Sequence, residues 1–469
     1  MHLPNYQDER TRTNKVFNTY DFAFNESQKN LYDGKSYHLK TYGCQMNEHD
    51  SENIKAILEY LGFRSEEDYL KADVVILNTC SIRENAHNKA FGMLGRFKHL
   101  KEERKNLVIG LMGCMAQEPV VVNKIKEKYP FVNFVIGTHN LYELGEVLQK
   151  SMSDNTQQIE VYSREQDLVL ALPYKRENQY KAFVNIIYGC DKFCTYCIVP
   201  YTRGKQRSRP YQDIINEVNS LVQNGYQEIT LLGQNVNAYG KDLYDDYDLT
   251  NLLEAVAKTN VPRIRFLTSY PSDFTSEMVD VIAKYKNICP SIHLPVQSGS
   301  NRILKLMGRR YTKEEYLKLF FEMKEKIPHV TISTDIIVGF PKETEEDFQE
   351  TLDLVKTCKF DNAYTFIYSV RKGTPAEKLL DTTSLKEKED RLKRLNKEVN
   401  SYFLLSNKAL IGKLVPVLVE GISSKENNVY GYSDTNKLVN FEGCKELIGT
   451  TVLVEITTAK TWSLDGRKK

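Results

Sequence analysis

The sequence predicts an α/β protein with three parts: an N-terminal βαβ domain with a parallel sheet, a central partial (β/α) barrel and a small C-terminal β-barrel. Short apolar runs alternate with amphipathic stretches over residues 36–150, which is typical of βαβ units. The same alternation returns over residues 181–380, where six such units indicate an open or closed barrel. Residues 412–462 change to β-rich runs separated by Gly, Ser and Asn, enough chain only for a small β module.

The elements follow from these runs in chain order. In the first domain we expect strands at 37–42, 74–77, 107–112 and 132–136, with helices that include 51–61 and 89–100. In the barrel we expect strands at 183–187, 229–232, 264–267, 292–294, 332–338 and 363–368. The C-terminal module is expected to have strands at 414–419, 437–441 and 451–456.

Changes in composition set the domain boundaries. Residues 1–35 are polar and aperiodic, and we expect a peripheral extension. Residues 151–180 are a polar stretch that is typical of a linker. Residues 383–410 carry charges of both signs, as in a solvated helix that trails the barrel. The predicted parts are therefore the extension 1–35, the first domain 36–150, the linker 151–180, the barrel with its helix 181–410 and the β module 411–469.

Composition and charge restrict the class of protein. The chain has 469 residues, 41% of them hydrophobic and 27% charged, with a formal net charge of +2. This balance is that of a globular protein and does not by itself indicate binding to nucleic acid or membrane. The sequence has no apolar run near the roughly 18 residues of a membrane helix, and no apolar core of a secretion signal near its start. We expect a cytoplasmic protein with reduced thiols and no membrane partner.

The sharpest motif is a cluster of three cysteines, Cys190, Cys194 and Cys197, directly after the first predicted barrel strand. Three thiolates can hold three irons of a 4Fe–4S cluster and leave the fourth iron open to a small molecule, such as the amino and carboxylate groups of S-adenosylmethionine. A zinc site is the alternative, but zinc prefers four ligands in paired spacing and no fourth lies nearby. The motif therefore predicts an iron–sulfur cluster that cleaves S-adenosylmethionine into a radical.

A second set, Cys44, Cys80 and Cys114, follows three successive predicted strands of the first domain at intervals of 36 and 34 residues. The C-terminal ends of parallel strands meet at one edge of a sheet, so these thiols are expected to converge. They would form a second site with three thiolates and one open iron. Three unrelated buried cysteines remain the alternative, because free cysteine is among the most buried residue types. The remaining cysteines, Cys289, Cys358 and Cys444, show no such pattern and are interpreted as structural.

At these residues the chain resembles the radical S-adenosylmethionine methylthiotransferases, most closely the MiaB type that modifies tRNA. The similarity covers about residues 36–462. Four stretches carry it: NTCSIRENA (78–86), CIVPYTRGKQRSR (197–209), LLGQNVNAYG (231–240) and LPVQSGSNRILKLMGRRYT (294–312). The resemblance implies an auxiliary-cluster domain, a radical-SAM barrel and a TRAM-like RNA-binding module. It implies two 4Fe–4S clusters and S-adenosylmethionine as cofactors.

The resemblance also implies a reaction. The branch with the best match adds a methylthio group to carbon 2 of isopentenyl-adenosine next to the tRNA anticodon, with two S-adenosylmethionine molecules and a sulfide on the auxiliary cluster. The implied partners are the tRNA anticodon stem-loop, an electron donor such as flavodoxin or ferredoxin, and a sulfur source. Alternatives are the sister reaction on threonylcarbamoyl-adenosine, methylthiolation of a ribosomal-protein aspartate, and a non-enzymatic iron–sulfur redox sensor that binds RNA.

Position suggests the residues that contact S-adenosylmethionine. Tyr196 lies next to Cys197 and is expected to pack on the adenine ring, unless it is a core aromatic residue. The loop after the second barrel strand has a glycine that lets the backbone approach a ligand. Ser298 after the fourth strand and Asp335 on the fifth are further candidates, each equally compatible with a structural polar group. The candidates are Tyr196, Gly233, Gln234, Asn235, Ser298 and Asp335.

Cations after the radical motif suggest RNA contacts. Four of them occur within seven residues with no acid among them, so we expect contacts to tRNA phosphates or to the cofactor carboxylate, the alternative being a solvated loop. In the C-terminal module, Tyr432 stands where the family often has an arginine, and it is expected to stack on a base instead. The candidates are Arg203, Lys205, Arg207, Arg209, Arg309, Arg310 and Tyr432.

Overall fold

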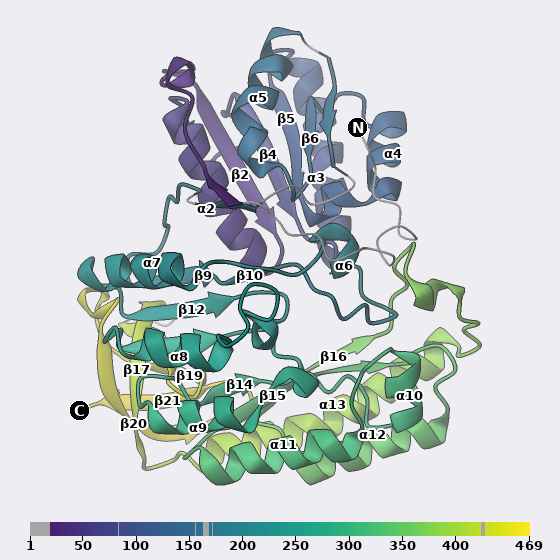
Figure 1. Ribbon diagram of the computed structural model, residues 1–469, viewed down its shortest axis with the longest axis vertical. Coiled ribbons are helices and arrows are strands. Elements are labelled where there is room, and N and C mark those ends of the chain that lie inside the picture. Colours follow the sequence, from purple (N-terminus) through teal and green to yellow (C-terminus); the bar gives the residue numbers. More distant parts are fainter. Residues whose placement is uncertain (1–18, 83, 155, 163–167, 171, 424–426) are drawn as a thin grey trace. The chain divides into compact units, whose positions relative to one another are not determined.

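The computed structural model describes residues 19–82, 84–154, 156–162, 168–170, 172–423 and 427–469 (Figure 1). The chain divides into two compact units. The first contains the chain up to Glu177 together with Ile187–Arg207 and Arg371–Thr374. The second contains Asn178–Ile186, Ser208–Val370 and Pro375–Lys469. Each unit is described by itself.

The first unit is built on a six-stranded sheet in which every pairing is parallel. β4 and β5 are buried along their whole length because helices cover both faces of the sheet. The strands, in spatial order, are β3 (Arg64–Ser65), β2 (Ser36–Tyr42), β4 (Val74–Thr79), β5 (Val108–Gly113), β6 (Phe134–Ile136) and β7 (Gln158–Glu160). The helices are α2 (Gln45–Tyr60), α3 (Glu84–Glu103), α4 (Pro119–Lys128) and α5 (Leu144–Ser153). The predicted parallel-sheet domain is confirmed.

Two segments differ from the sequence prediction. The expected linker 151–180 contains β7, the sixth strand of the sheet, whose residues are all half-buried. Periodicity did not predict β7 because a strand at the edge of a sheet buries little surface and can therefore have a polar sequence. The described part of the extension 1–35 contains β1 (Thr19–Asp21), which pairs in parallel with β8 (Leu168–Leu170). Phe22 and Phe24 pack against the core beneath α2 and α5, so this segment is attached to the domain, whereas residues 1–18 lie outside the described residues.

The second unit contains the predicted partial barrel. Two three-stranded parallel sheets, in the orders β13-β12-β9 and β14-β15-β16, are linked by a parallel bridge from Ile264 to Ile288. The strands are β9 (Lys181–Asn185), β12 (Glu228–Leu232), β13 (Arg263–Phe266), β14 (Ser291–His293), β15 (Thr331–Val338) and β16 (Asn362–Ile367). The helices between them are α7 (Tyr211–Gln223), α8 (Leu249–Ala257), α9 (Ser276–Lys284), α10 (Asn301–Leu306), α11 (Lys313–Lys326) and α12 (Glu345–Cys358). Such an arrangement places candidate ligand loops at the C-terminal ends of the strands.

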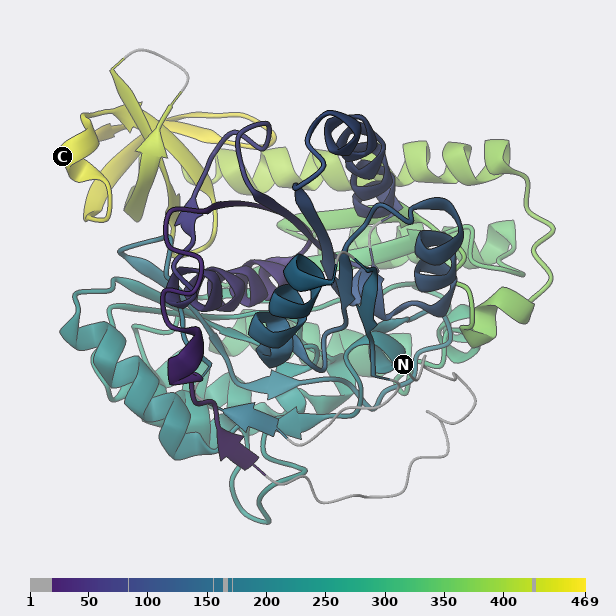
Figure 2. The ribbon, with the colours of Figure 1, turned by 90° about the horizontal axis from the view of Figure 1, so that it is seen from above.

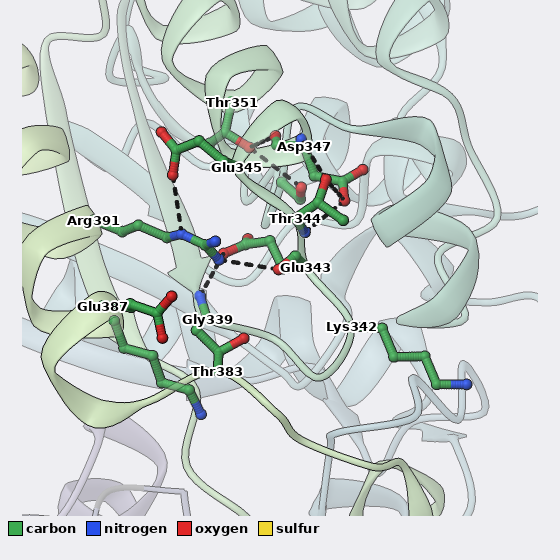
Figure 3. A network of polar contacts seen from close by, with 12 residues as sticks. Gly339, Lys342, Glu343, Thr344, Glu345, Asp347, Thr351, Thr383, Glu387 and Arg391 are labelled. Carbon is green, nitrogen blue, oxygen red and sulfur yellow. Dashed lines mark hydrogen bonds and ion pairs between the residues drawn. The ribbon is translucent and has the colours of Figure 1, made fainter.

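The charged segment after the barrel forms α13 (Leu385–Lys408), which begins with a capping box between Ser384 and Glu387. It is a helix as predicted, but one of its faces is buried. Arg391 on that face donates to Glu343, and the Glu343 carboxylate also accepts the N–H of Gly339 (Figure 3). The helix is therefore held to the barrel by an internal ion pair as well as by apolar residues.

The C-terminal module is a closed barrel with strand order β17-β18-β19-β21-β20, seen in yellow and yellow-green beside α13 in Figure 2. Valines and Ile456 fill its interior. Its strands are β17 (Leu414–Ile422), β18 (Asn428–Ser433), β19 (Leu438–Glu442), β20 (Thr451–Ala459) and β21 (Leu464–Lys468). The small β-barrel is confirmed, although β18 and β21 were not predicted because glycine and charged residues interrupt their apolar pattern. In the described ranges, none of the helices combines the length and the hydropathy required to cross a bilayer.

Candidate metal centres

The strand register brings Cys44, Cys80 and Cys114 to one edge of the N-terminal sheet. Tyr42 at the end of β2 is the Cα partner of Thr79 at the end of β4, and Thr79 is the partner of Gly113 at the end of β5. Cys80 and Cys114 directly follow two of these residues, and Cys44 follows Tyr42 after one glycine. The predicted convergence therefore results from three adjacent parallel strands that end at the same level.

The three thiols of this set, which we call the auxiliary triad, interact with one another. Cys44 accepts a hydrogen bond from Cys80, and this lowers the pKa of Cys44 to about 6. The same hydrogen bond and then burial raise the pKa of Cys80. Burial raises the pKa of Cys114 to about 11, while the charge of Arg203 acts in the opposite direction. The auxiliary triad is thus a compact group of soft ligands in which a negative charge on one sulfur is felt by the others.

The auxiliary triad has the donor set of a cluster rather than of a single ion. A 4Fe–4S cluster places each thiolate on a separate iron, so its ligands surround a larger volume. Three thiolates without a fourth cysteine fit a cluster with one iron free of protein ligands.

Arg203 contacts the auxiliary triad, although the sequence suggested that it binds RNA. It is only 6% exposed. Its Nε donates to Cys114 Sγ at 3.0 Å, and its two terminal nitrogens donate to the Asp50 carboxylate. The enclosed and paired guanidinium argues against the predicted phosphate contact at Arg203. Asp50 has no motif of its own, and the sequence analysis missed it.

The radical triad, Cys190, Cys194 and Cys197, lies in the first unit and forms a tight loop. Gly189 opens the loop with a φ of +72°, and a Cβ at this position would lie 2.1 Å from the Lys205 carbonyl oxygen. The Cys190 N–H donates to the Gly204 carbonyl, and the Cys197 N–H donates to the Cys194 carbonyl. Burial raises the pKa of Cys190, and the charges of Cys197 and Cys194 raise it further. The three sulfurs are therefore neighbours, as the spacing predicted.

The candidate cofactor residues differ in how they are engaged. Tyr196 is half-buried beside Cys197. In the second unit, Gly233 and Asn235 are buried in the loop after β12, with Gln234 half-buried between them. Asn235 Nδ2 donates to Asp273 at 2.7 Å, whereas its buried Oδ1 accepts no hydrogen bond. An oriented buried amide with one unused acceptor has the chemistry to receive a ligand N–H.

The other two cofactor candidates have local structural partners. Ser298 is fully buried and lies 3.4 Å from the Thr351 hydroxyl, and it accepts the N–H of Ser300 at the start of α10. Asp335 on β15 is half-buried, and its carboxylate lies 3.5 Å from His293. These contacts agree with the structural alternative for Ser298 and leave the Asp335 carboxylate as the more accessible group.

Two more of the expected RNA contacts are buried. Arg209 donates to the Asn185 carbonyl at 2.7 Å and to Glu217 at 2.9 Å. Arg207 is 8% exposed, and its guanidinium donates to the carbonyls of Arg203 and Lys205. These two arginines hold the chain segment in place, and their burial argues against the predicted phosphate contacts. The partners named here are main-chain carbonyls and one carboxylate outside the run of cations, which a count of charges within the run does not include.

The remaining basic candidates are more accessible. Lys205 is half-buried, and the Arg310 side chain is exposed. Arg309 stacks on Tyr270, with its guanidinium carbon 4.2 Å from the ring centroid, and donates to the Tyr311 hydroxyl. Lys205 and Arg310 stay predictions for RNA contact, whereas Arg309 is held by aromatic residues.

Tyr432 lies where the C-terminal barrel meets the (β/α) barrel, both within the second unit. Arg263 donates to the carbonyls of Tyr432 and Ser433, and Arg265 donates to those of Ser433 and Asp434. Burial raises the pKa of the Tyr432 phenol. The end of β18, with the turn that follows it, therefore docks on the N-terminal strand ends of the (β/α) barrel, and base stacking by the half-buried Tyr432 ring stays a prediction. This end of a (β/α) barrel generally serves stability rather than chemistry.

Glu228 completes that contact. Its carboxylate accepts from Arg263 and from Arg265, and these charges lower the pKa of Glu228 to about 2 against the effect of burial.

Of the cysteines outside the triads, Cys289 and Cys358 are buried, as a structural role requires, whereas Cys444 is exposed.

The chain matches three family models in the order of its parts. The "Uncharacterized protein family UPF0004" model matches residues 36–137, the radical SAM superfamily model residues 184–355 and the TRAM domain model residues 408–469. Among solved structures, the radical S-adenosylmethionine methyltransferase TsrM from Kitasatospora setae is 14% identical, with a TM-score of 0.52 over 73% of this chain and 75% of that one. This likeness concerns the fold.

Curated relatives extend over almost the whole chain. A Staphylococcus epidermidis protein named tRNA-2-methylthio-N(6)-dimethylallyladenosine synthase is 54% identical over 448 residues, which is 95% of this chain and 87% of that protein. A Staphylococcus aureus protein of the same name is 52% identical over 466 residues, covering 99% and 91%. With both cysteine triads in place on the matching domains, the chain belongs to the family of radical S-adenosylmethionine methylthiotransferases formed by these synthases.

Proposed function

We propose that this enzyme adds a methylthio group to carbon 2 of isopentenyl-adenosine next to the tRNA anticodon. The observation that carries the proposal is the pair of three-cysteine sites in one compact unit, one at the ends of β2, β4 and β5 and one in the loop after β10 (Ile187–Tyr188). A single cluster would account for S-adenosylmethionine cleavage but for no sulfur source. The names of the relatives supply the substrate.

The radical triad is proposed to hold one 4Fe–4S cluster and the auxiliary triad a second. When bound, the two clusters and S-adenosylmethionine supply a carbon radical and a sulfur to be transferred, which a strong aromatic C–H bond requires. The protein contributes ligands, orientation and exclusion of water. In the second unit, Asn235, whose Nδ2 is fixed by Asp273, keeps a buried Oδ1 that can accept a ligand N–H, and in the first unit Tyr196 lies beside Cys197.

The electrons and the sulfur atoms that the reaction consumes determine which partner proteins it requires. Each reductive cleavage of S-adenosylmethionine consumes one electron, so a one-electron donor such as flavodoxin or ferredoxin is required. Each turnover removes a sulfur atom, so a sulfur source must replace it. The TRAM module and Arg310, both in the second unit, are proposed to contact the anticodon stem-loop through its phosphates, and Lys205 is a separate candidate in the first unit. We place the reaction in the cytoplasm, where thiols stay reduced.

The test uses the reconstituted full-length enzyme with tRNA that carries isopentenyl-adenosine, a chemical reductant and S-adenosylmethionine. Mass spectrometry of the digested tRNA is expected to show the methylthio nucleoside. Cys44→Ala should still cleave S-adenosylmethionine to deoxyadenosine but give no methylthio product, whereas Cys444→Ala, which changes an exposed thiol, should act like the wild type. Methylthiolation by Cys44→Ala, or a preference for tRNA with threonylcarbamoyl-adenosine, would contradict the proposal.

A further inference from the structure

Arg203 connects the two cysteine triads. It lies six residues after Cys197 and caps the C-terminal end of α6 (Val199–Thr202), where its backbone N–H donates to the carbonyl of Val199, so its main chain belongs to the segment of the radical triad. Its side chain nevertheless reaches Cys114 of the auxiliary triad, with 3.0 Å between Nε and Sγ. All four residues named here belong to the first compact unit.

The direction of the Arg203 guanidinium is determined by Asp50. Nη2 lies 2.5 Å from Asp50 Oδ2 and Nη1 lies 3.3 Å from Oδ1, so the carboxylate holds the outer edge of the planar fork. This two-point contact leaves Nε directed at the sulfur. Asp50 is itself buried on α2, the helix that begins after Cys44. Both members of the ion pair are thus attached to segments that carry cluster cysteines.

The need to compensate the buried charge of Arg203 does not by itself explain why its Nε contacts Cys114 Sγ. A buried arginine requires a carboxylate to compensate its charge, and Asp50 supplies it. Arg391 shows the same solution elsewhere, since it is also 6% exposed and pairs with Glu343 without a cysteine partner. The additional N–H···S hydrogen bond of Arg203 places a donor and a positive charge on a ligand of the auxiliary site.

We propose that Arg203 is a positioning residue that raises the reduction potential of the auxiliary cluster, and that Asp50 moderates this effect. The inference rests on the proposed function, because it takes Cys114 as a ligand of that cluster. Reduction adds negative charge to a cluster, and hydrogen bonds to its sulfurs and a nearby cation stabilise that charge. The negative charge of Asp50 acts in the opposite direction.

The two members of the pair therefore predict shifts of opposite sign. Arg203→Gln removes the cation and should move the midpoint potential of the auxiliary cluster to a more negative value. Asp50→Asn keeps the arginine but removes the opposing charge, and should move it to a more positive value. A residue that served only the fold would give no such reversal. Asp50→Asn also keeps the inference testable if Arg203→Gln does not fold.

The experiment is a potentiometric series followed by electron paramagnetic resonance on the anaerobically reconstituted holoenzyme. The signal that changes when S-adenosylmethionine is added identifies the radical cluster, and the other signal belongs to the auxiliary cluster. The expected result is that both variants shift only the auxiliary midpoint, in opposite directions, and that Arg391→Gln shifts neither. An unchanged auxiliary midpoint in both variants, or shifts of the same sign, would overturn the inference.

The wild-type sample separates this inference from the proposed function. About eight irons per chain and two distinct signals support two clusters, whatever the variants do. If the wild type has only about four irons, the proposed function fails first. If it has both clusters and the two variants leave the auxiliary midpoint unchanged, only the role of Arg203 fails.

Discussion

Asn47 and Asn78 join the first two segments of the auxiliary triad through a pair of buried hydrogen bonds. Asn47 Nδ2 donates to Asn78 Oδ1 at 3.2 Å, and Asn78 Nδ2 donates to the Asn47 carbonyl at 2.8 Å. Asn47 lies in the first turn of α2 three residues after Cys44, and Asn78 lies on β4 two residues before Cys80. The spacing of Cys44 and Cys80 is thus set by amide groups as well as by strand register.

Asn78→Ala should therefore weaken both the fold and the auxiliary site. The change leaves the Asn47 carbonyl and the Ser51 hydroxyl without their buried donor, which costs about 2 kcal/mol in the free energy of unfolding. Urea unfolding of the metal-free protein measures this loss, and the reconstituted variant should retain less iron than the wild type. Asn216→Ala, at an exposed position of α7, is the control, and its free energy of unfolding should stay within about 0.5 kcal/mol of the wild-type value. Equal stability of the two variants would contradict the role of Asn78.

A substitution at Gly113 tests the backbone conformation directly before Cys114. Its φ is +91°, and a Cβ would lie 2.3 Å from Asn78 Oδ1 and 2.7 Å from the Thr79 carbonyl oxygen. Gly113→Ala should therefore destabilise the protein by at least about 1–2 kcal/mol in thermal or chemical unfolding. Gly92→Ala, at an exposed position of α3 with open space around the new methyl group, should instead stabilise the protein by about 0.5–1 kcal/mol. The opposite signs distinguish this constraint from a general effect of alanine.

Lys342 occupies a left-handed conformation, with a φ of +70°, in the turn before α12. Figure 3 shows its side chain directed away from the Glu343–Arg391 ion pair, and it is exposed, so the lysine gains little from this position. Lys342→Gly should raise the free energy of unfolding by about 1 kcal/mol because glycine adopts this conformation without strain. Lys318→Gly, at an exposed interior position of α11, should lower it by about 1 kcal/mol. A loss of stability in Lys342→Gly would show that the lysine side chain has a stabilising contact.

Glu343 predicts a pH dependence of stability. Burial raises the pKa of its carboxyl to about 7, with Asp347 adding to the rise, while Gly339 and Arg391 act in the opposite direction. A carboxyl with a raised pKa in the folded state holds its proton more tightly there than in the unfolded chain. Its contribution is therefore fully present at pH values below about 4.5 and is lost as the pH rises to about 7.

The comparison of wild type with Glu343→Gln isolates this effect. The stability of the wild type relative to the variant should fall by up to about 3 kcal/mol between pH 4.5 and pH 7, measured by chemical unfolding at a series of pH values. Glu345→Gln is the control, since Arg394 lowers the pKa of that exposed carboxyl and reverses the direction. A constant difference between wild type and Glu343→Gln over this range would contradict the raised pKa.

Strand periodicity and cysteine spacing were enough to predict the auxiliary triad. Cys44, Cys80 and Cys114 each follow an apolar run, and parallel strands of similar length end at one edge, so the convergence depends only on local patterns. Their supporting residues were not predictable in this way. Asn47 and Asn78 are polar residues inside elements that periodicity treats as core, and nothing in either segment shows that they face each other.

The burial of the basic segment after the radical triad was not predicted for a related reason. A run of cations without nearby acids looks exposed, but the carboxylate that pairs with Arg203 belongs to Asp50, 153 positions earlier in the chain. Tyr432 is a similar case, because the arginines that bind the carbonyls at the end of its strand lie on β13 of another domain. Whether a charged side chain is buried depends on partners that are distant in the sequence. A single sequence therefore shows the charged residue but not the residue that pairs with it.

The measurement that tests the two-cluster account most directly is the iron content of anaerobically reconstituted cysteine variants. Cys80→Ala and Cys190→Ala should each bind about four irons, half of the roughly eight in the wild type, and the double variant almost none. Cys358→Ala, which removes a buried thiol outside both triads, should keep the full amount. Wild-type iron in Cys80→Ala would contradict the account, because the edge of the N-terminal sheet would then hold no cluster.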